Sequence, residues 1–202
     1  MEPQVVARYP SVTTVLGDML AKPLLVNWAE KQGREGNSVA DILTSSSKRG
    51  VEVHAALERW ALHGESVVPS AAMGEAEPYS RALRDWIRKT EPVVYRVGDE
   101  IQAERLVVHT GLGYAGQVDL VIERNGMPLL VDVKTSSGVY ESHHIQLSAY
   151  RMAWDHMNNS PAAASIVLHL TKGGNYKEHL VSDLSMAWTY QVKAWWELYH
   201  AN

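Results

Sequence analysis

The chain has 202 residues, of which 46% are hydrophobic and 21% charged, and its net charge at pH 7 is −4. These values are typical of a soluble globular protein, and the acidic balance gives no bulk attraction to nucleic acid. The sequence contains no cysteine, which excludes disulfides, zinc–thiolate centres and iron–sulfur clusters. No apolar run approaches the length of a membrane span, and the first residues do not begin a signal peptide, so we expect a cytoplasmic protein.

The first part of the chain is predicted to be helical. Thr13 and Thr14 can cap a short helix that ends near Ala21. Pro23 suits the first turn of the next helix, because the amide proton that proline lacks would be unpaired there anyway. Apolar residues at helical spacing predict two further helices, over 47–62 and 77–89.

Basic side chains occur in both of these later helices. Lys48 and Arg49 are adjacent, and Arg81, Arg84 and Arg88 lie along one side of their helix. Such residues usually form a solvated surface. In a chain of net charge −4 they are also the best candidates for contacts with phosphate groups, because nucleic-acid binding would need a local basic track.

The second part of the chain alternates strands and helices. Strands are expected over 100–108, 113–124 and 128–135, a helix over 142–157, strands over 164–170 and 175–181, and a closing helix over 183–199. Antiparallel strands followed by a crossover helix and a further strand predict an α/β fold with a central mixed sheet. We expect one domain over 1–202, with a helical part over 1–92 and a sheet core over 93–202.

Asn125-Gly126 predicts a tight β-hairpin, because both residues tolerate the positive φ that a type I′ turn requires. Counting from this turn pairs Arg124 with Met127, Leu120 with Val131, Asp119 with Asp132, and Gln117 with Lys134. One face of the hairpin is then wholly apolar and consists of Val118, Leu120, Ile122, Leu129, Val131 and Val133.

On the other face, Asp119 and Asp132 would lie directly opposite each other, and like charges in that position destabilise a sheet. A bound cation removes the repulsion. The two carboxylates and the backbone carbonyl of Val133 offer oxygen ligands that suit Mg²⁺ or Mn²⁺. Lys134 would lie beside this metal site, and we expect it to stay protonated and to stabilise negative charge rather than to act as a base.

Glu104 is a further candidate on the preceding strand. A four-residue loop from His109 to Leu112 would pair Val108 with Gly113 and Glu104 with Gln117. Glu104 would then share the face of the two aspartates. A one-residue change in the loop would move it to the other face, where it would be an ordinary solvated strand residue.

Gln146 and Tyr150 are four residues apart, and therefore lie on one side of the predicted helix that follows Lys134. A helix in that place can overhang the carboxylate end of the hairpin. The amide and the hydroxyl could orient a water, a phosphate or a terminal nucleotide. His143 shares their side of the helix, which leaves a phosphate contact open. In isolation all three would be ordinary surface residues.

Several motifs occur together in a defined order. They are Gly50 and His54 in the upstream helix, the G-x-x-D of Gly116 and Asp119, the D-x-K of Asp132 and Lys134, and the Q-x-x-x-Y of Gln146 and Tyr150. This set resembles the PD-(D/E)XK nuclease superfamily, and within it the RecB-type exonucleases. The segment 9–16 also resembles phage-encoded members. Val118 stands where the name of the superfamily has proline, and the missing cysteines direct the comparison to relatives without an iron–sulfur cluster.

The resemblance implies a restriction-endonuclease-like α/β core and a metal-dependent DNA exonuclease. His54 would add an imidazole to the metal ligands and favour Mn²⁺. Asp119, Asp132, Lys134, Glu104, Gln146 and Tyr150 would form the catalytic site. The expected partner is linear DNA with a free end, together with a recombination or single-strand-annealing protein, in the host cytoplasm if the chain is phage-encoded. Oligomerisation stays open.

Two other interpretations remain. A sequence-specific endonuclease could use the same core, although it would normally bring a recognition region that is not visible in the sequence. A catalytically silent nucleic-acid-binding protein could share the fold, although nothing structural would maintain two opposed aspartates. Cleavage of linear against circular DNA would separate the three.

Overall fold

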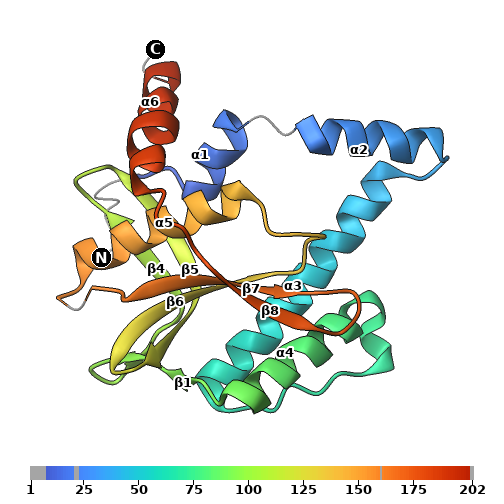
Figure 1. Cartoon of the computed structure of the whole chain (residues 1–202), viewed down its shortest axis with the longest axis horizontal. Helices are drawn as coiled ribbons and strands as arrows, with labels where there is room; N and C mark the ends of the chain where they lie inside the picture. The colour runs from blue at the N-terminus through green and yellow to red at the C-terminus, as the bar shows by residue number, and fades with distance from the viewer. Residues whose placement is uncertain (1–7, 21–22, 160, 201–202) are drawn as a thin grey trace, which may run out of the picture.

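The computed structural model describes residues 8–20, 23–159 and 161–200 (Figure 1). The helical elements are α1 (Val12–Met19), α2 (Pro23–Arg34), α3 (Val39–His63), the 3₁₀ helix η1 (Ala71–Ala76), α4 (Glu77–Thr90), α5 (Glu141–Met157), the π-helix η2 (Ala187–Lys193) and α6 (Ala194–His200). The strands are β1 (Val93–Val94), β2 (Arg96–Val97), β3 (Glu100–Ile101), β4 (Ala103–His109), β5 (Tyr114–Arg124), β6 (Met127–Lys134), β7 (Ala164–Leu170) and β8 (Tyr176–Leu180).

Serine side chains cap the starts of α1 and α3. The Ser11 hydroxyl accepts the Thr14 N–H at 3.0 Å, so α1 begins before the predicted threonine cap, and it ends at Met19. The predicted end near Ala21 lies outside the described residues. The Ser38 hydroxyl accepts the Asp41 N–H at 3.3 Å, so α3 begins well before the predicted start near residue 47. Such caps satisfy amide protons that a helix start leaves unpaired.

The sheet is mixed, as predicted. Its order is β1-β5-β6-β7-β8, with β4 also paired to β5. The β4–β5, β5–β6 and β7–β8 pairs are antiparallel, whereas β6 and β7 are parallel and are joined by the crossover helix α5. With helices on both faces and a helical region before the sheet, the protein has the restriction-endonuclease-like α/β fold (Figure 1).

The sheet separates two apolar cores. On one face, α3 and α4 contribute buried residues such as Leu57 and Trp86. On the other face, α1, α5 and η2 contribute residues such as Val15, Trp154 and Trp188. The closing helix, predicted over 183–199, begins at Ser185 and contains the π-helical turn. Among the described residues, no helix combines the length and the apolar composition needed to cross a bilayer.

The hairpin register around Asn125 and Gly126 is confirmed. Both residues have positive φ, 56° and 75°, and the ladder runs from Arg124–Met127 to Leu120–Val131. Beyond Leu120–Val131 the predicted ladder does not continue: β5 leaves β6, while β6 stays paired with β7 as far as Lys134–His169. We call this opening between β5 and β6 the strand fork.

The fork also changes which face one side chain occupies. Leu120, Leu129 and Val131 are buried on one face, as predicted, and pack in the core beside α3, but Val118 packs in the opposite core with Val121. A regular strand would keep Val118 and Leu120 on one face, since side chains alternate. The alternation is therefore interrupted between these two residues, at Asp119.

The predicted register between β4 and β5 is wrong by two residues. Val108 pairs with Ala115 rather than Gly113, because Gly113 has a φ of 63° and belongs to the turn, where its N–H donates to the His109 carbonyl at 2.8 Å. Ladder pairs lie on either side of Glu104, which therefore stands opposite Asp119 instead of Gln117. Those pairs are Ala103–Leu120 and Arg105–Val118.

Candidate active site

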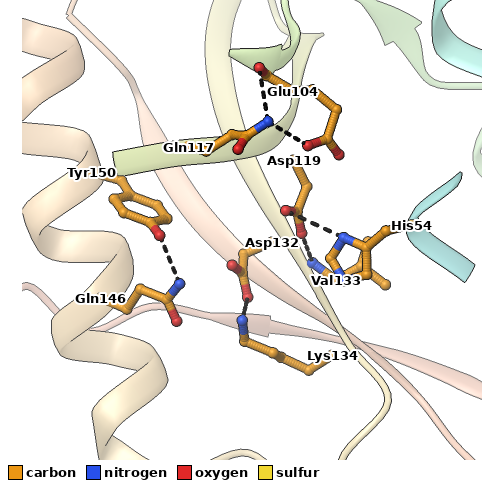
Figure 2. Close-up of polar contacts among 9 residues, drawn as sticks. All are labelled: His54, Glu104, Gln117, Asp119, Asp132, Val133, Lys134, Gln146 and Tyr150. Carbon is orange, nitrogen blue, oxygen red and sulfur yellow. Dashed lines mark hydrogen bonds and ion pairs between the residues drawn. The ribbon is translucent and has the colours of Figure 1, made fainter. Parts of the chain in front are cut away.

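Asp119 lies at the strand fork, where its carboxylate replaces a missing ladder partner. Its Oδ2 accepts the backbone N–H of Val133 at 2.7 Å. Burial opposes ionisation, but the hydrogen bond and charge of His54, the charge of Lys134 and the Val133 N–H together hold the pKa of Asp119 below its usual range. The side chain is therefore a fixed carboxylate between the two strands (Figure 2).

His54 reaches the fork from α3. Its Nδ1 lies 3.4 Å from Asp119 Oδ1. Burial alone would lower the pKa of His54, but the hydrogen bond to Asp119 and the charges of Asp119 and Asp132 raise it to about 9. At neutral pH the positive charge of the His54 imidazolium neutralises the Asp119 carboxylate. A metal cation bound beside Asp119 would take over this role.

Asp132 and Lys134 form a second charged pair on β6. Lys134 Nζ lies 2.7 Å from Asp132 Oδ2, and Asp132 is only 2% exposed. Burial opposes the charged form of Lys134, but the two aspartates outweigh it and raise the pKa of Lys134. Burial raises the pKa of Asp132 to about 6, with Lys134 opposing and Asp119 adding to the shift. Both groups are charged at neutral pH, and the predicted ladder pair of Asp119 and Asp132 is replaced by two separate ion pairs.

Glu104 completes the acidic side of the site. Its φ of 48° is unusual for a residue other than glycine, and the Gln117 side-chain amide donates to both its Oε2 at 2.8 Å and its carbonyl oxygen at 3.3 Å. Burial and the charge of Asp119 raise the pKa of Glu104 to about 7, although His54 opposes the shift. The ligand atoms of His54, Glu104 and Asp119 all lie within 4.8 Å of one another.

Gln146 and Tyr150 face the fork from α5 (Figure 2). Gln146 Nε2 donates to the Tyr150 hydroxyl at 2.8 Å, and both residues are buried rather than on the surface. Burial raises the pKa of Tyr150, so the phenol stays protonated. The ring lies so close to Gly116 that a Cβ there would be 2.2 Å from Tyr150 Cε1. Gly116 therefore provides the space for the Tyr150 ring, a reason that the sequence motif alone does not reveal.

His54 lines two cavities. The first, of about 380 Å³, is lined by cations and hydroxyls that include Arg49, Lys134, Ser46, Ser47, Thr135 and Ser136. The second, of about 440 Å³, is bordered by the carboxylates Glu58 and Glu104. Sequence reasoning missed the four hydroxyls and Glu58, because only the fold brings them beside the motif residues.

His143 and Gln146 also line the first cavity. His143 Nδ1 accepts the Tyr140 N–H at 3.2 Å. Burial and the charge of Lys134 lower the pKa of His143 to about 4, so this imidazole is neutral.

The five predicted basic residues separate into two groups. Arg49 lines the first cavity, and the exposed Lys48 precedes it on α3. The arginines of α4 border neither cavity. Arg81 Nη2 lies 3.6 Å from Glu77 Oε2, and Arg84 Nη2 lies 3.0 Å from Asp85 Oδ1. The structure thus brings Arg49 to the site and leaves the α4 row elsewhere.

The structure combines a mixed sheet flanked by helices with a strand fork that gathers carboxylates, an imidazole and a lysine. This is a restriction-endonuclease-like α/β fold with a candidate metal site. A sequence profile of the PD-(D/E)XK nuclease superfamily matches residues 29–195, and the chain belongs to this superfamily. A solved structure titled "Crystal structure of SSO0001" is similar at 15% identity and a TM-score of 0.39, over 83% of this chain and 89% of that one. No curated protein matches the sequence significantly.

Proposed function

We propose that the protein is a metal-dependent deoxyribonuclease that hydrolyses DNA from free ends. The observation that carries the proposal is the strand fork, where Asp119 meets His54 and Glu104 on one side and the Asp132–Lys134 pair on the other. Membership of the PD-(D/E)XK nuclease superfamily supports phosphodiester hydrolysis as the reaction.

The donor atoms fit a divalent cation. His54, Glu104 and Asp119 offer one imidazole nitrogen and carboxylate oxygens within 4.8 Å of one another, a set that suits Mg²⁺ or Mn²⁺. Asp132 and the Val133 carbonyl are the further ligands that we expect to join them. When bound, the cation supplies Lewis-acid neutralisation of the phosphate and lowers the pKa of a water.

The other residues of the site position and neutralise the substrate. The raised pKa of Lys134 keeps its ammonium charged, so it stabilises the non-bridging phosphate oxygens rather than removing a proton. A hydrogen bond fixes the Gln146 amide and the Tyr150 phenol to each other. Together they orient the DNA strand beside Lys134.

The mode of action and the biological setting rest on the RecB-type resemblance. We propose an exonuclease without an iron–sulfur cluster, acting as one domain over 1–202 with a recombination or single-strand-annealing partner. A phage setting, and with it the host cytoplasm, are parts of this proposal. The alternatives are an endonuclease on the same core and a catalytically silent DNA-binding protein.

The test compares linear DNA with covalently closed circular DNA in Mg²⁺, Mn²⁺ or chelator. We expect degradation of linear DNA with either metal, none in chelator, and intact circles. Asp119→Ala, Asp132→Ala and Lys134→Ala should each abolish activity, whereas Asp99→Ala, in the loop between β2 and β3, serves as a control. Efficient opening of the circles would instead identify an endonuclease, and DNA binding without cleavage in any metal would identify a silent binding protein.

A further inference from the structure

The first cavity has the chemistry of a phosphate-binding site. Its lining combines the guanidinium of Arg49 and the ammonium of Lys134 with four hydroxyl side chains, and none of its lining residues is acidic. Cations and hydroxyl donors are the groups that bind phosphate oxygens in proteins. Because Lys134 belongs to both the fork and the cavity, a phosphate held there would be next to the reacting one.

Arg49 is held in a fixed orientation. Its Nη2 donates to the Thr135 carbonyl at 3.2 Å, its guanidinium carbon lies 4.7 Å from the centre of the Tyr79 ring, and its side chain is only 14% exposed. Within the described part of the chain, its buried Nε has no hydrogen-bond partner. A guanidinium that is held in place and still has free N–H donors is preorganised to bind an anion, because its side chain loses little conformational entropy when the anion binds.

In this structure Arg49 pairs with a carboxylate of the protein itself. Glu75, in η1, places Oε2 3.6 Å from Arg49 Nη1 and accepts a hydrogen bond from the Ser45 hydroxyl at 2.5 Å. The Glu75 side chain is 68% exposed. An ion pair with so exposed a partner is weak, and a phosphate group could displace it.

We propose that the cavity binds a phosphate group of the nucleic-acid strand through Arg49, and that Glu75 competes with this phosphate for the guanidinium. The inference rests on the proposed function and adds a second point of substrate attachment to it. The phosphate is either an internal one next to the cleaved bond or the terminal one at a strand end.

The test measures binding of fluorescent oligonucleotides by anisotropy in chelator, so that no cleavage occurs. Glu75→Gln should bind about two- to fivefold more tightly than the wild type, because an exposed competing ion pair is removed. Glu77→Gln is the matched control: it removes the same charge and breaks a pair of the same 3.6 Å length with Arg81, and neither residue lines a cavity. Its affinity should equal that of the wild type.

A double-mutant cycle separates phosphate binding by Arg49 from the contribution that its side chain makes to packing. Arg49→Met should weaken binding, and in that background Glu75→Gln should have no effect. Tighter binding by Glu75→Gln cannot come from a damaged fold, so the test survives even if Arg49→Met is unstable. Oligonucleotides with phosphorylated or hydroxyl ends distinguish the two sources: a gain confined to phosphorylated ends identifies a terminal phosphate, and an equal gain identifies an internal one.

Three results would overturn the inference: unchanged or weaker binding by Glu75→Gln, an equal gain in Glu77→Gln, or a gain that persists without Arg49. A wild type that degrades DNA while Glu75→Gln shows no gain would remove the phosphate site and leave the nuclease standing. A wild type that neither binds nor cleaves nucleic acid would remove both.

Discussion

Asp119 holds the fork through two directional contacts. Its carboxylate accepts the Val133 N–H and lies beside the His54 imidazole, and its pKa is correspondingly low. The sequence suggested a residue destabilised by an opposing aspartate. In the structure it has partners of its own, so its removal should weaken the fold as well as the chemistry.

The first prediction compares Asp119→Ala with Asp119→Asn. The alanine variant leaves the buried Val133 N–H unpaired, which should lower the free energy of unfolding by about 1–3 kcal/mol, whereas the asparagine oxygen can still accept it. Urea denaturation in chelator measures both variants. Equal losses would mean that the Val133 hydrogen bond contributes nothing, and both variants should be inactive in either case.

The second prediction concerns pH. The folded protein raises the pKa of His54 from 6.5 to about 9, so it binds more protons than the unfolded chain in that interval. The stability from His54 is therefore complete below pH 6.5 and is lost as the pH rises through about 9. The melting temperature in chelator should fall across this window.

His54→Gln should flatten this decline, because glutamine does not titrate. His63→Gln is the control, since His63 ends α3 away from the fork and lines neither cavity. A decline of the same size in His54→Gln and in the wild type would contradict the assignment to His54.

At the scale of the elements, α5 packs closely against β5 because Gly116 has no side chain. The Tyr150 ring covers Gly116, and a Cβ at that position would overlap it. The third prediction is that Gly116→Ala displaces the ring and with it Gln146. Overpacking should cost about 1–3 kcal/mol of stability, and the misplaced amide should lower turnover by roughly a hundredfold.

Gly50→Ala is the matched control for stability. A Cβ there would have its nearest contact, Thr135 Oγ1, at 3.9 Å, so the helix should gain about 0.5–1 kcal/mol. Thermal denaturation and steady-state kinetics test the pair. A Gly116→Ala variant as stable and active as the wild type would show that the ring is free to move.

The elements also show where sequence reasoning succeeds and where it fails. Asn125 and Gly126 determine their hairpin locally, so the β5–β6 register was predictable by counting. The fork was not, because the separation of β5 from β6 depends on helices packed against both faces. Glu104 was predicted to pair with Gln117 and to share the face of the aspartates; the register was wrong by two residues, and the structure brings Glu104 next to Asp119 itself.

For the molecule as a whole, basic residues lie on two helices with different relations to the site. Arg49 borders the first cavity, whereas the α4 arginines border neither cavity and two of them have acidic neighbours on their own helix. The sequence could not separate these groups, because both consist of basic side chains on predicted helices. Only the packing of α3 against the fork distinguishes them.

The fourth prediction follows from this division. Replacing Lys48 and Arg49 with methionine should reduce the log–log salt slope of DNA binding by about 0.7–0.9 for each lost phosphate contact. The triple replacement of Arg81, Arg84 and Arg88 should leave the slope unchanged. Anisotropy titrations across a salt series measure both variants, and the reverse pattern would place the DNA path along α4.

The order of the site residues along the chain also sets the order in which they leave the ribosome. Asp119, Asp132 and Lys134 belong to one short hairpin, and contacts of short sequence separation form first. His54 precedes the hairpin in the chain, whereas the α5 residues Gln146 and Tyr150 leave the ribosome only after it. The hairpin that carries the carboxylates is therefore complete before α5 can cover Gly116, whereas the fork, which depends on helices packed against both faces, forms only once α5 is in place.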